Sequence, residues 1–233
     1  MKLSVVIPNF YVERLSNLRE IIASIQTGSL WPDEIIIWNN LDAQHIAFPG
    51  LKPEVLVVQS PRNVGSQARL LAAMMARGEW VLFLDNDTAV RRRTIENLVV
   101  HADRYANVDA VMTLEGREFI QGVPYARWPK VYGHGLKSPR NVYLTLGRGE
   151  IVRRRVLNRV IGSFPFDERT QMDDLHLSDA YDRSGVPVLV VPCEKGFSDL
   201  HDISMGGVGM CKDANWNARR DEVARAIREE GLS

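Results

Sequence analysis

Short apolar runs in the first half of the chain limit the folds that it can adopt. Four such runs lie at 3–7, 34–38, 54–58 and 80–84. Strands that are apolar on both faces are typical of parallel sheets covered by helices on either side. Residues 14–27 and 64–77 have apolar positions at helical spacing. The pattern therefore predicts an α/β domain with a mostly parallel sheet and helices on both faces.

The second half of the chain has a less regular pattern. Residues 116–149 are rich in glycine, proline and aromatic side chains, and this segment is too long and too aromatic for a passive connection. Further elements are expected as helices at 150–160, 172–183 and 217–230, a strand at 186–191 and an irregular loop at 197–215. No shift in composition marks a boundary. We therefore expect a single domain over 1–233, with halves at 1–113 and 114–233, the second including the C-terminal helix.

Composition excludes several classes of protein. The 29 Lys and Arg residues balance 29 Asp and Glu, and zero net charge argues against a nucleic-acid partner. The spacing of Cys193 and Cys211 fits neither a zinc ribbon nor a redox pair, which favours reduced thiols. The N-terminal apolar run is too short for a signal peptide, and no segment has the length of a membrane helix. We expect a cytoplasmic protein without a transmembrane segment.

The residues directly after the fourth apolar run carry the strongest chemical signal. A strand at 80–84 would deliver Asp85 and Asp87 to the carboxyl edge of the sheet, where open α/β proteins bind ligands. Two carboxylates one residue apart supply the oxygen ligands that Mg²⁺ or Mn²⁺ prefers. A turn followed by a helix N-cap would have the same residue types, so this motif alone does not establish a function.

The order of several motifs resembles a known family. The segments are SVVIPNF at 4–10, EIIIWNN at 34–40, RNVGSQARLLAAMMARGEWVLFLDND at 62–87 and QMDDLHLS at 171–178. In order and spacing they resemble the family 2 glycosyltransferases of the GT-A fold, which has a Rossmann-like sheet. The resemblance covers roughly residues 3–191. It implies that the first half binds a nucleotide-diphosphate sugar and a divalent metal, and that an aspartate in the second half deprotonates the acceptor hydroxyl.

The resemblance implies a set of contacts to the nucleotide sugar. Residue by residue, they are Pro8, Asn9, Asn39, Asn40, Arg62, Asn63, Arg69, Asp85 and Asn86. The family often has aspartates where this chain has Asn39 and Asn40. Since asparagine both donates and accepts hydrogen bonds, uracil, thymine and guanine all stay possible as the base. A UDP-sugar is the favoured donor, and GDP- or dTDP-sugars stay open. A simple strand-ending turn would explain the two asparagines equally well.

The resemblance also implies a metal site. Asp85 and Asp87 would hold Mn²⁺ or Mg²⁺. His201, in the segment after the last expected strand, would be a third ligand, because some relatives supply a histidine there. The alternative for His201 is a surface histidine.

A second chemical site is expected at the start of the helix at 172–183. Asp174 takes the position of the family's catalytic base, and Asp173 that of a carboxylate that holds the acceptor. Both would also favour the positive end of the helix dipole without any catalytic role. Trp128 is expected to stack on the acceptor, because apolar sugar faces pack on aromatic rings. The acceptor would be a glycan, a protein or another hydroxyl compound.

Two other functions stay open. A nucleotidyltransferase also combines an α/β nucleotide-binding half with acidic metal ligands, but residues 8–14 lack its glycine-rich basic loop. A catalytically inactive nucleotide-sugar-binding protein is the other alternative, and the intact Asp85, Asp87 and Asp174 count against it.

The segment 140–159 is rich in arginine. It holds six arginines and one acid, Glu150. Such a run is either a solvated helix face or a surface for a phosphate-bearing partner.

Overall fold

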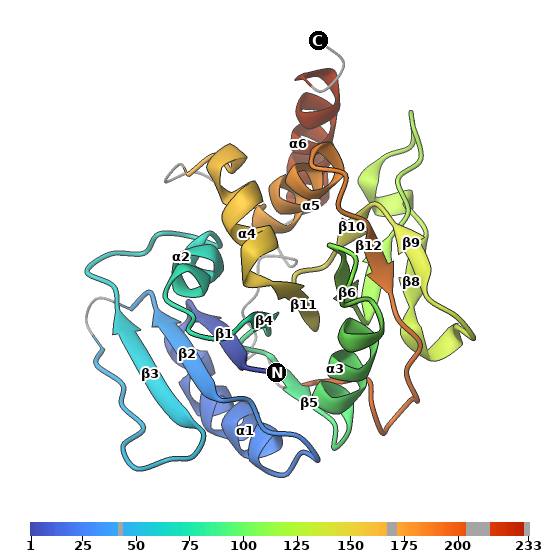
Figure 1. Ribbon diagram of the computed structural model, residues 1–233. Coiled ribbons are helices and arrows are strands. Elements are labelled where there is room, and N and C mark those ends of the chain that lie inside the picture. Colours follow the sequence, from blue (N-terminus) through green and yellow to red (C-terminus); the bar gives the residue numbers. More distant parts are fainter. Residues whose placement is uncertain (42–43, 167–171, 204–214, 231–233) are drawn as a thin grey trace.

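The computed structural model describes residues 1–41, 44–166, 172–203 and 215–230. Its centre is an eight-stranded mixed sheet with the order β3-β2-β1-β4-β11-β6-β12-β9 (Figure 1). The strands are β1 (Leu3–Asn9), β2 (Glu34–Asn39), β3 (Glu54–Gln59), β4 (Trp80–Phe83), β6 (Val111–Thr113), β9 (Arg140–Val142), β11 (Glu150–Arg153) and β12 (Val188–Val190). Strands β3, β2, β1 and β4 are parallel, as are β6 and β12, whereas β11 and β9 run antiparallel to their neighbours. The predicted α/β class with a mostly parallel sheet is confirmed.

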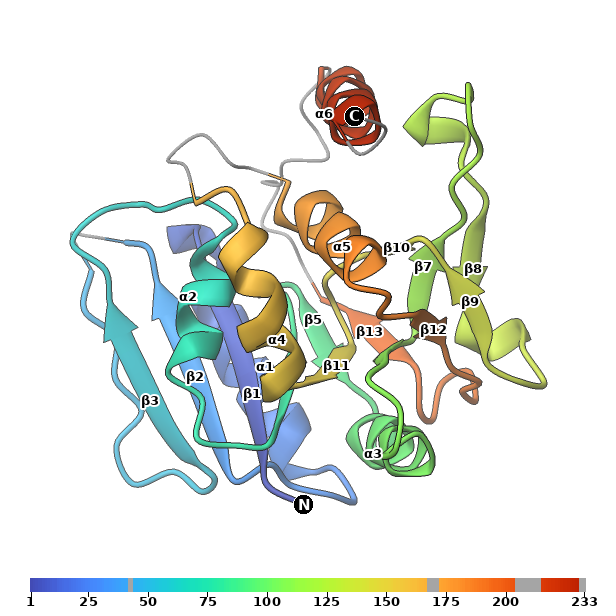
Figure 2. The same ribbon diagram turned by 45° about the horizontal axis from the view of Figure 1, so that its top comes forward.

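Helices cover both faces of this sheet, as the apolar runs predict. One face packs against α1 (Leu15–Gln26) and α3 (Thr94–Arg104). The other packs against α2 (Ala68–Met74), α4 (Arg154–Val160) and α5 (Asp173–Arg183), which Figure 2 shows on the same side. Side chains alternate between the two faces along a strand. Val5 and Ile7 of β1 therefore pack in the core formed with α1 and α3, and Val6 packs in the core formed with α2, α4 and α5.

Smaller elements surround the carboxyl edge of the sheet. A three-stranded sheet joins β10 (Leu144–Thr145), β7 (Glu115–Arg117) and β8 (Lys130–Tyr132), and β13 (Leu200–Asp202) pairs with β5 (Thr88–Val90). Short 3₁₀ helices occur at η1 (Val12–Arg14), η2 (Tyr125–Arg127), η3 (Gly133–Gly135) and η4 (Ile161–Ser163). The C-terminal helix α6 (Trp216–Glu230) packs against η2 and α5. The segment 116–149 is therefore a folded part of the site region and not a linker.

The expected helix at 150–160 is wrong in its first four residues. Residues Glu150–Arg153 form β11, which lies between β4 and β6, and only Arg154–Val160 are helical. Ile151 and Val152 are fully buried on opposite faces of the sheet. An apolar pair flanked by charged residues looks the same at the start of a helix and in a short buried strand, so the spacing could not separate the two.

The other expected elements agree with the structure to within a few residues. Helix α2 begins at Ala68 and not near Val64, because Gly65 has a φ of 73° and keeps the preceding residues in a turn. The expected helices at 172–183 and 217–230 correspond to α5 and α6. The expected irregular loop at 197–215 contains β13, and residues 204–214 lie outside the described part.

The two halves expected from the sequence share one sheet. Strands β11 and β12, from the second half, flank β6 of the first half. No helix in the described ranges has both the length and the apolar character needed to cross a membrane. Cys193 is a free thiol, and burial raises its pKa to about 12. Cys211 lies outside the described residues.

Candidate active site

Three asparagines connect the carboxyl ends of the central strands. Asn9 ends β1 and is paired in register with Asn39, which ends β2. The side chain of Asn9 donates to Asn39 Oδ1 (2.8 Å), and Asn86 donates to Asn9 Oδ1 (3.0 Å). All three are buried. These amides fix the positions of the strand ends and of the Asp85–Asp87 segment after β4.

The residues expected to contact the nucleoside lie near this edge. The Asn39 amide also donates to Gln44 O and Gln59 Oε1, both at 2.8 Å, so its hydrogen-bonding groups are used within the protein. Asn40 Oδ1 accepts from the backbone N–H of Val64 (3.1 Å) and anchors the turn at 62–65. The structure gives Asn39 and Asn40 a clear structural role, and their contact with a nucleotide stays a prediction.

Three further residues of the predicted donor site differ in exposure. Pro8 is buried within β1, opposite Trp38 of β2. Arg62 and Asn63 are exposed on the turn before α2, where Asn63 Oδ1 accepts from Gly65 N–H (2.9 Å). Arg62 and Asn63 are thus accessible to a ligand at the edge of the sheet.

Arg69 brings the two predicted acidic motifs together. It lies on α2 with 8% of its side chain exposed, its Nη2 is 2.7 Å from Asp85 Oδ1, and its Nε is 2.5 Å from Asp173 Oδ2. Burial opposes the charge of Arg69, but Asp173 and Asp85 hold its pKa above the usual value. Burial raises the pKa of Asp85 to about 6 despite the opposing effect of Arg69. One guanidinium therefore serves two carboxylates from opposite halves of the chain.

Arg14 binds the other aspartate of the first motif. Its Nη1 lies 3.0 Å from Asp87 Oδ2 and donates to Asn86 Oδ1 (2.7 Å), and the side chain is 7% exposed. Arg14 is not among the site residues predicted from the sequence. A signal was present: Arg14 is four positions before Leu18 and therefore on the apolar face of the helix pattern, where a charged residue needs a partner.

Arg220 binds Asp174, the predicted base. The guanidinium donates to both carboxylate oxygens, Nη1 to Oδ1 (3.1 Å) and Nη2 to Oδ2 (2.5 Å). The two side chains are 4% and 13% exposed, respectively. Arg220 is not among the predicted site residues either, although its spacing to Ala224 and Ile227 places it on the buried face of α6.

Glu150 is a further buried acid, and the charges of Arg69 and Asp173 act on it. It is fully buried and accepts hydrogen bonds from Tyr181 Oη (2.8 Å) and Thr145 Oγ1 (2.9 Å). Burial raises its pKa to about 7, although both hydrogen bonds act in the opposite direction. In the sequence, Glu150 stands out only as the single acid of an arginine-rich segment.

The arginines of 140–159 do not form one surface. Arg148 lies beside the site, where it pairs with Glu115 (3.0 Å) and Asp202. Arg155 and Arg159 both pair with Asp109, which lies two residues before β6. The segment runs from β9 through β10 and β11 into α4, so its charges are distributed over separate places.

The predicted metal ligands are only partly brought together. Asp85 and Asp87 share the edge after β4, whereas His201 is exposed on β13 with its Nδ1 3.0 Å from Arg91 Nη2. Among the described residues, no group of three or more His, Cys, Asp or Glu could hold a metal. The two carboxylates suit a hard cation whose remaining ligands are phosphate oxygens and water. The metal site stays a prediction.

The predicted acceptor contacts are not exposed. Trp128 has 3% of its surface exposed, and its Nε1 donates to Val123 O (2.8 Å) within an aromatic cluster. Asp173 has 4% exposed and is bound to Arg69. Trp128 nevertheless lines a cavity of about 510 Å³ together with Tyr125 and Asp221. The acceptor contacts of Trp128 and Asp173 stay predictions.

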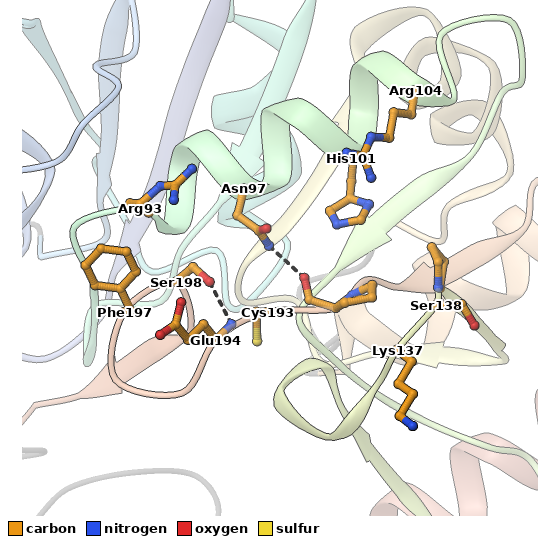
Figure 3. A pocket seen from close by; sticks show the side chains of 12 residues that line it. Arg93, Asn97, His101, Arg104, Lys137, Ser138, Cys193, Glu194, Phe197 and Ser198 are labelled. Carbon is orange, nitrogen blue, oxygen red and sulfur yellow. Dashed lines mark hydrogen bonds between the residues drawn. The ribbon is translucent and has the colours of Figure 1, made fainter.

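A separate cavity of about 440 Å³ lies along α3 (Figure 3). Arg93, Asn97 and His101 line its α3 side, and the loop at 192–198 lines another. Asn97 Nδ2 donates to Pro192 O (2.9 Å), and Glu194 N–H donates to Ser198 Oγ (2.8 Å). None of the predicted site residues lines this cavity.

The sequence is similar to a known family of proteins and to a curated protein. The family model described as glycosyl transferase family 2 matches residues 4–159. The uncharacterized glycosyltransferase YwdF of Bacillus subtilis (strain 168) is 27% identical over 217 residues, which are 90% of this chain and 79% of YwdF.

Solved structures of S. aureus TarS have the same fold. TarS 1–349 in complex with UDP-GlcNAc has a TM-score of 0.60 at 18% identity, covering 91% of this chain and 61% of that one. A further crystal structure of TarS 1–349 has a TM-score of 0.60 at 20% identity, covering 96% of this chain and 65% of that one. The chain therefore spans less than two thirds of the TarS 1–349 structures.

Proposed function

Since the chain belongs to glycosyl transferase family 2 and is a glycosyltransferase of the GT-A fold, we propose that it transfers a sugar from a nucleotide-diphosphate sugar to an acceptor hydroxyl with inversion. The observation that carries this proposal is the convergence at Arg69. The guanidinium holds Asp85, from the motif after β4, against Asp173, from the start of α5. Asp174, the proposed base, is the next residue along the chain.

The donor would lie along the carboxyl edge of β1, β2 and β4. Arg62 and Asn63, which are exposed on the turn before α2, would contact it, and Asp85 and Asp87 would hold Mn²⁺ or Mg²⁺. A bound divalent cation would offset the negative charge that develops on the leaving nucleoside diphosphate. We favour a UDP-sugar, because a structure of TarS, which shares the fold, holds UDP-GlcNAc.

Asp174 would accept the proton of the attacking hydroxyl. A general base must lie within hydrogen-bond reach of that hydroxyl, and the partly exposed carboxylate of Asp174 can be approached from solvent. A single displacement at the anomeric carbon inverts its configuration. An α-linked donor would therefore yield a β-linked product.

Product analysis tests this proposal. The chain is incubated with UDP-GlcNAc, GDP-mannose or a dTDP-sugar, each with and without Mn²⁺, with water or a simple sugar as acceptor. We expect a nucleoside diphosphate and a free or transferred sugar of inverted configuration. Release of pyrophosphate, retention of configuration, or no turnover with any donor would contradict the proposal.

A further inference from the structure

Arg220 lies within a stack of alternating cationic and aromatic groups. Its Cζ is 4.2 Å from the ring centroid of Tyr125 and 5.5 Å from that of Trp216. The Cζ of Arg117 lies 4.4 Å from the same Tyr125 ring. Both arginines therefore contact the Tyr125 ring, and Arg220 also contacts Trp216. We refer to these four residues as the cation–π stack.

The stack is anchored to the backbone on both sides of the site. Arg117 Nη1 donates to Tyr125 O (3.2 Å) and Trp128 O (3.1 Å), which holds η2 against β7. The backbone N–H of Tyr125 donates to the carboxylate of Asp221 on α6. Arg220 can hardly move within this frame without breaking contacts on two elements.

The fixed guanidinium presents its fork to Asp174. Both oxygens of Asp174 accept from it, in the two-point geometry that planar guanidinium and carboxylate groups share. Although burial disfavours the charge of Arg220, Asp174 holds its pKa above the usual value, so the group stays cationic. Oδ1 of Asp174 also accepts from the backbone N–H of Leu175 (3.0 Å), whereas Oδ2 keeps a lone-pair position that can accept from another hydroxyl.

We propose that Arg220, held by the cation–π stack, is a positioning residue that orients the Asp174 carboxylate for proton abstraction. This inference rests on the proposed function, in which Asp174 is the base. It makes the C-terminal helix a part of the catalytic apparatus, although α6 lies beyond the family match at 4–159. Lysine cannot replace Arg220, because an ammonium offers neither the planar fork nor the stacking face.

The experiment measures UDP release from UDP-GlcNAc with water as acceptor, together with UDP affinity by calorimetry. The variants are Arg220→Ala, Arg220→Lys, Trp216→Leu, Asp174→Asn and the double variant Arg220→Ala/Asp174→Asn. Arg219→Ala, at an exposed position next to Arg220 on α6, is the matched control. Thermal unfolding reports whether each variant is folded.

We expect kcat to fall about 10²-fold in Arg220→Ala, because displacement of a catalytic group by about 1 Å can cost that much. The KM for UDP-GlcNAc and the UDP affinity stay near the parental values. Arg220→Lys does not restore turnover, Trp216→Leu lowers it less, and added guanidinium ion partly rescues Arg220→Ala. In the Asp174→Asn background, removal of Arg220 has no further effect, since the two residues act as one unit.

Several outcomes would overturn the inference. Parental turnover in Arg220→Ala, full activity of Arg220→Lys, or independent effects in the double variant would each exclude the positioning role. If Arg220→Ala does not fold, the kcat, KM and UDP affinity of Arg220→Lys and Trp216→Leu test the positioning role instead. A parent chain that releases no UDP contradicts the proposed function itself, and the two failures are therefore distinguishable.

Discussion

Arg69 and Asp173 form a buried ion pair, with 2.5 Å between Nε and Oδ2, that joins α2 to the first turn of α5. Both side chains have less than a tenth of their surface exposed. Because α2 belongs to the first half of the chain and α5 to the second, this pair fixes the two acidic motifs relative to each other. The geometry of the site therefore depends on a contact that is distant in sequence.

Removal of Arg69 should strongly destabilise the fold. In Arg69→Met, Asp173 and Asp85 lose their shared cation, and breaking a buried pair by removing one partner typically costs about 3–5 kcal/mol. The free energy of unfolding in urea measures the effect. Arg92→Met, at an exposed position, is the control and should change stability by less than about 0.5 kcal/mol. Equal stability of the two variants would contradict the expectation.

Gly147 should not tolerate a side chain. Its φ is 71°, its carbonyl accepts from Arg69, and an added Cβ would collide with the Arg69 guanidinium. In Gly147→Ala, Arg69 must shift away from Asp85, so we expect lower stability and weaker UDP binding. Gly162→Ala is the control, because a Cβ there meets open space at an ordinary φ. Normal UDP affinity in Gly147→Ala would show that Arg69 does not shape the donor site.

Glu150 should make stability depend on pH. Its pKa rises from about 4.5 to about 7 on folding, so its stabilising effect is complete below about pH 4.5 and is lost as pH rises through 7. Glu150→Gln cannot titrate. The stability of the parent relative to this variant should therefore fall between pH 5 and pH 8, by up to about 3 kcal/mol. Urea unfolding at both pH values measures it.

A matched variant separates this effect from the general pH response. Glu20→Gln replaces an exposed acid on α1 and should differ from the parent equally at both pH values. The difference in free energy of unfolding between the parent and Glu150→Gln is the quantity to compare across pH. If this difference does not change with pH, the Glu150 carboxyl has the same ionisation in the folded and unfolded chain.

Asp174→Asn should separate catalysis from donor binding. The amide cannot take the proton, so kcat should fall by about 10²–10⁴-fold while UDP affinity is retained. In Asp173→Asn the change should appear mainly in the KM for the donor, because Asp173 binds Arg69 and through it Asp85. Steady-state UDP release measures both constants. Near-parental kcat in Asp174→Asn would exclude it as the base.

Asp87 should be required for metal-dependent binding. The thermal shift that Mn²⁺ adds to that of UDP reports binding to the folded chain. In Asp87→Asn this increment should disappear, whereas the baseline melting temperature falls only because the pair with Arg14 is weakened. His201→Ala tests the third predicted ligand in the same assay. An unchanged increment there would leave His201 as a surface partner of Arg91.

The sequence predicts the strands and helices well where their patterns are long and regular. The run at 34–38 and the helix pattern at 14–27 correspond closely to β2 and α1, because burial on one or both faces leaves a clear periodicity. Asp85 and Asp87 lie at the edge after β4, as the strand pattern at 80–84 predicts. The strand β11 cannot be predicted in the same way, since four residues are too few to show a period.

The cations of the site were harder to predict than its acids. Asp174 follows from a motif, but Arg220 reaches it from α6, and no local pattern links the two positions. The same holds for Arg14, because it lies just before α1 whereas its partner Asp87 follows β4. Arg14 and Arg220 are both charged residues on the apolar faces of helical patterns. Such positions indicate buried cations that need an acidic partner.

The antiparallel strand between β4 and β6 has a consequence for synthesis on the ribosome. The edge of β4 cannot be paired by β11 until Glu150–Arg153 have left the exit tunnel, and β6 has no parallel neighbour until Val188–Val190 follow. A nascent chain that ends shortly after residue 113 thus carries unpaired strand edges, which are prone to wrong association. Folding must wait for the second half, and fragments divided near residue 113 should regain the fold only when both are present.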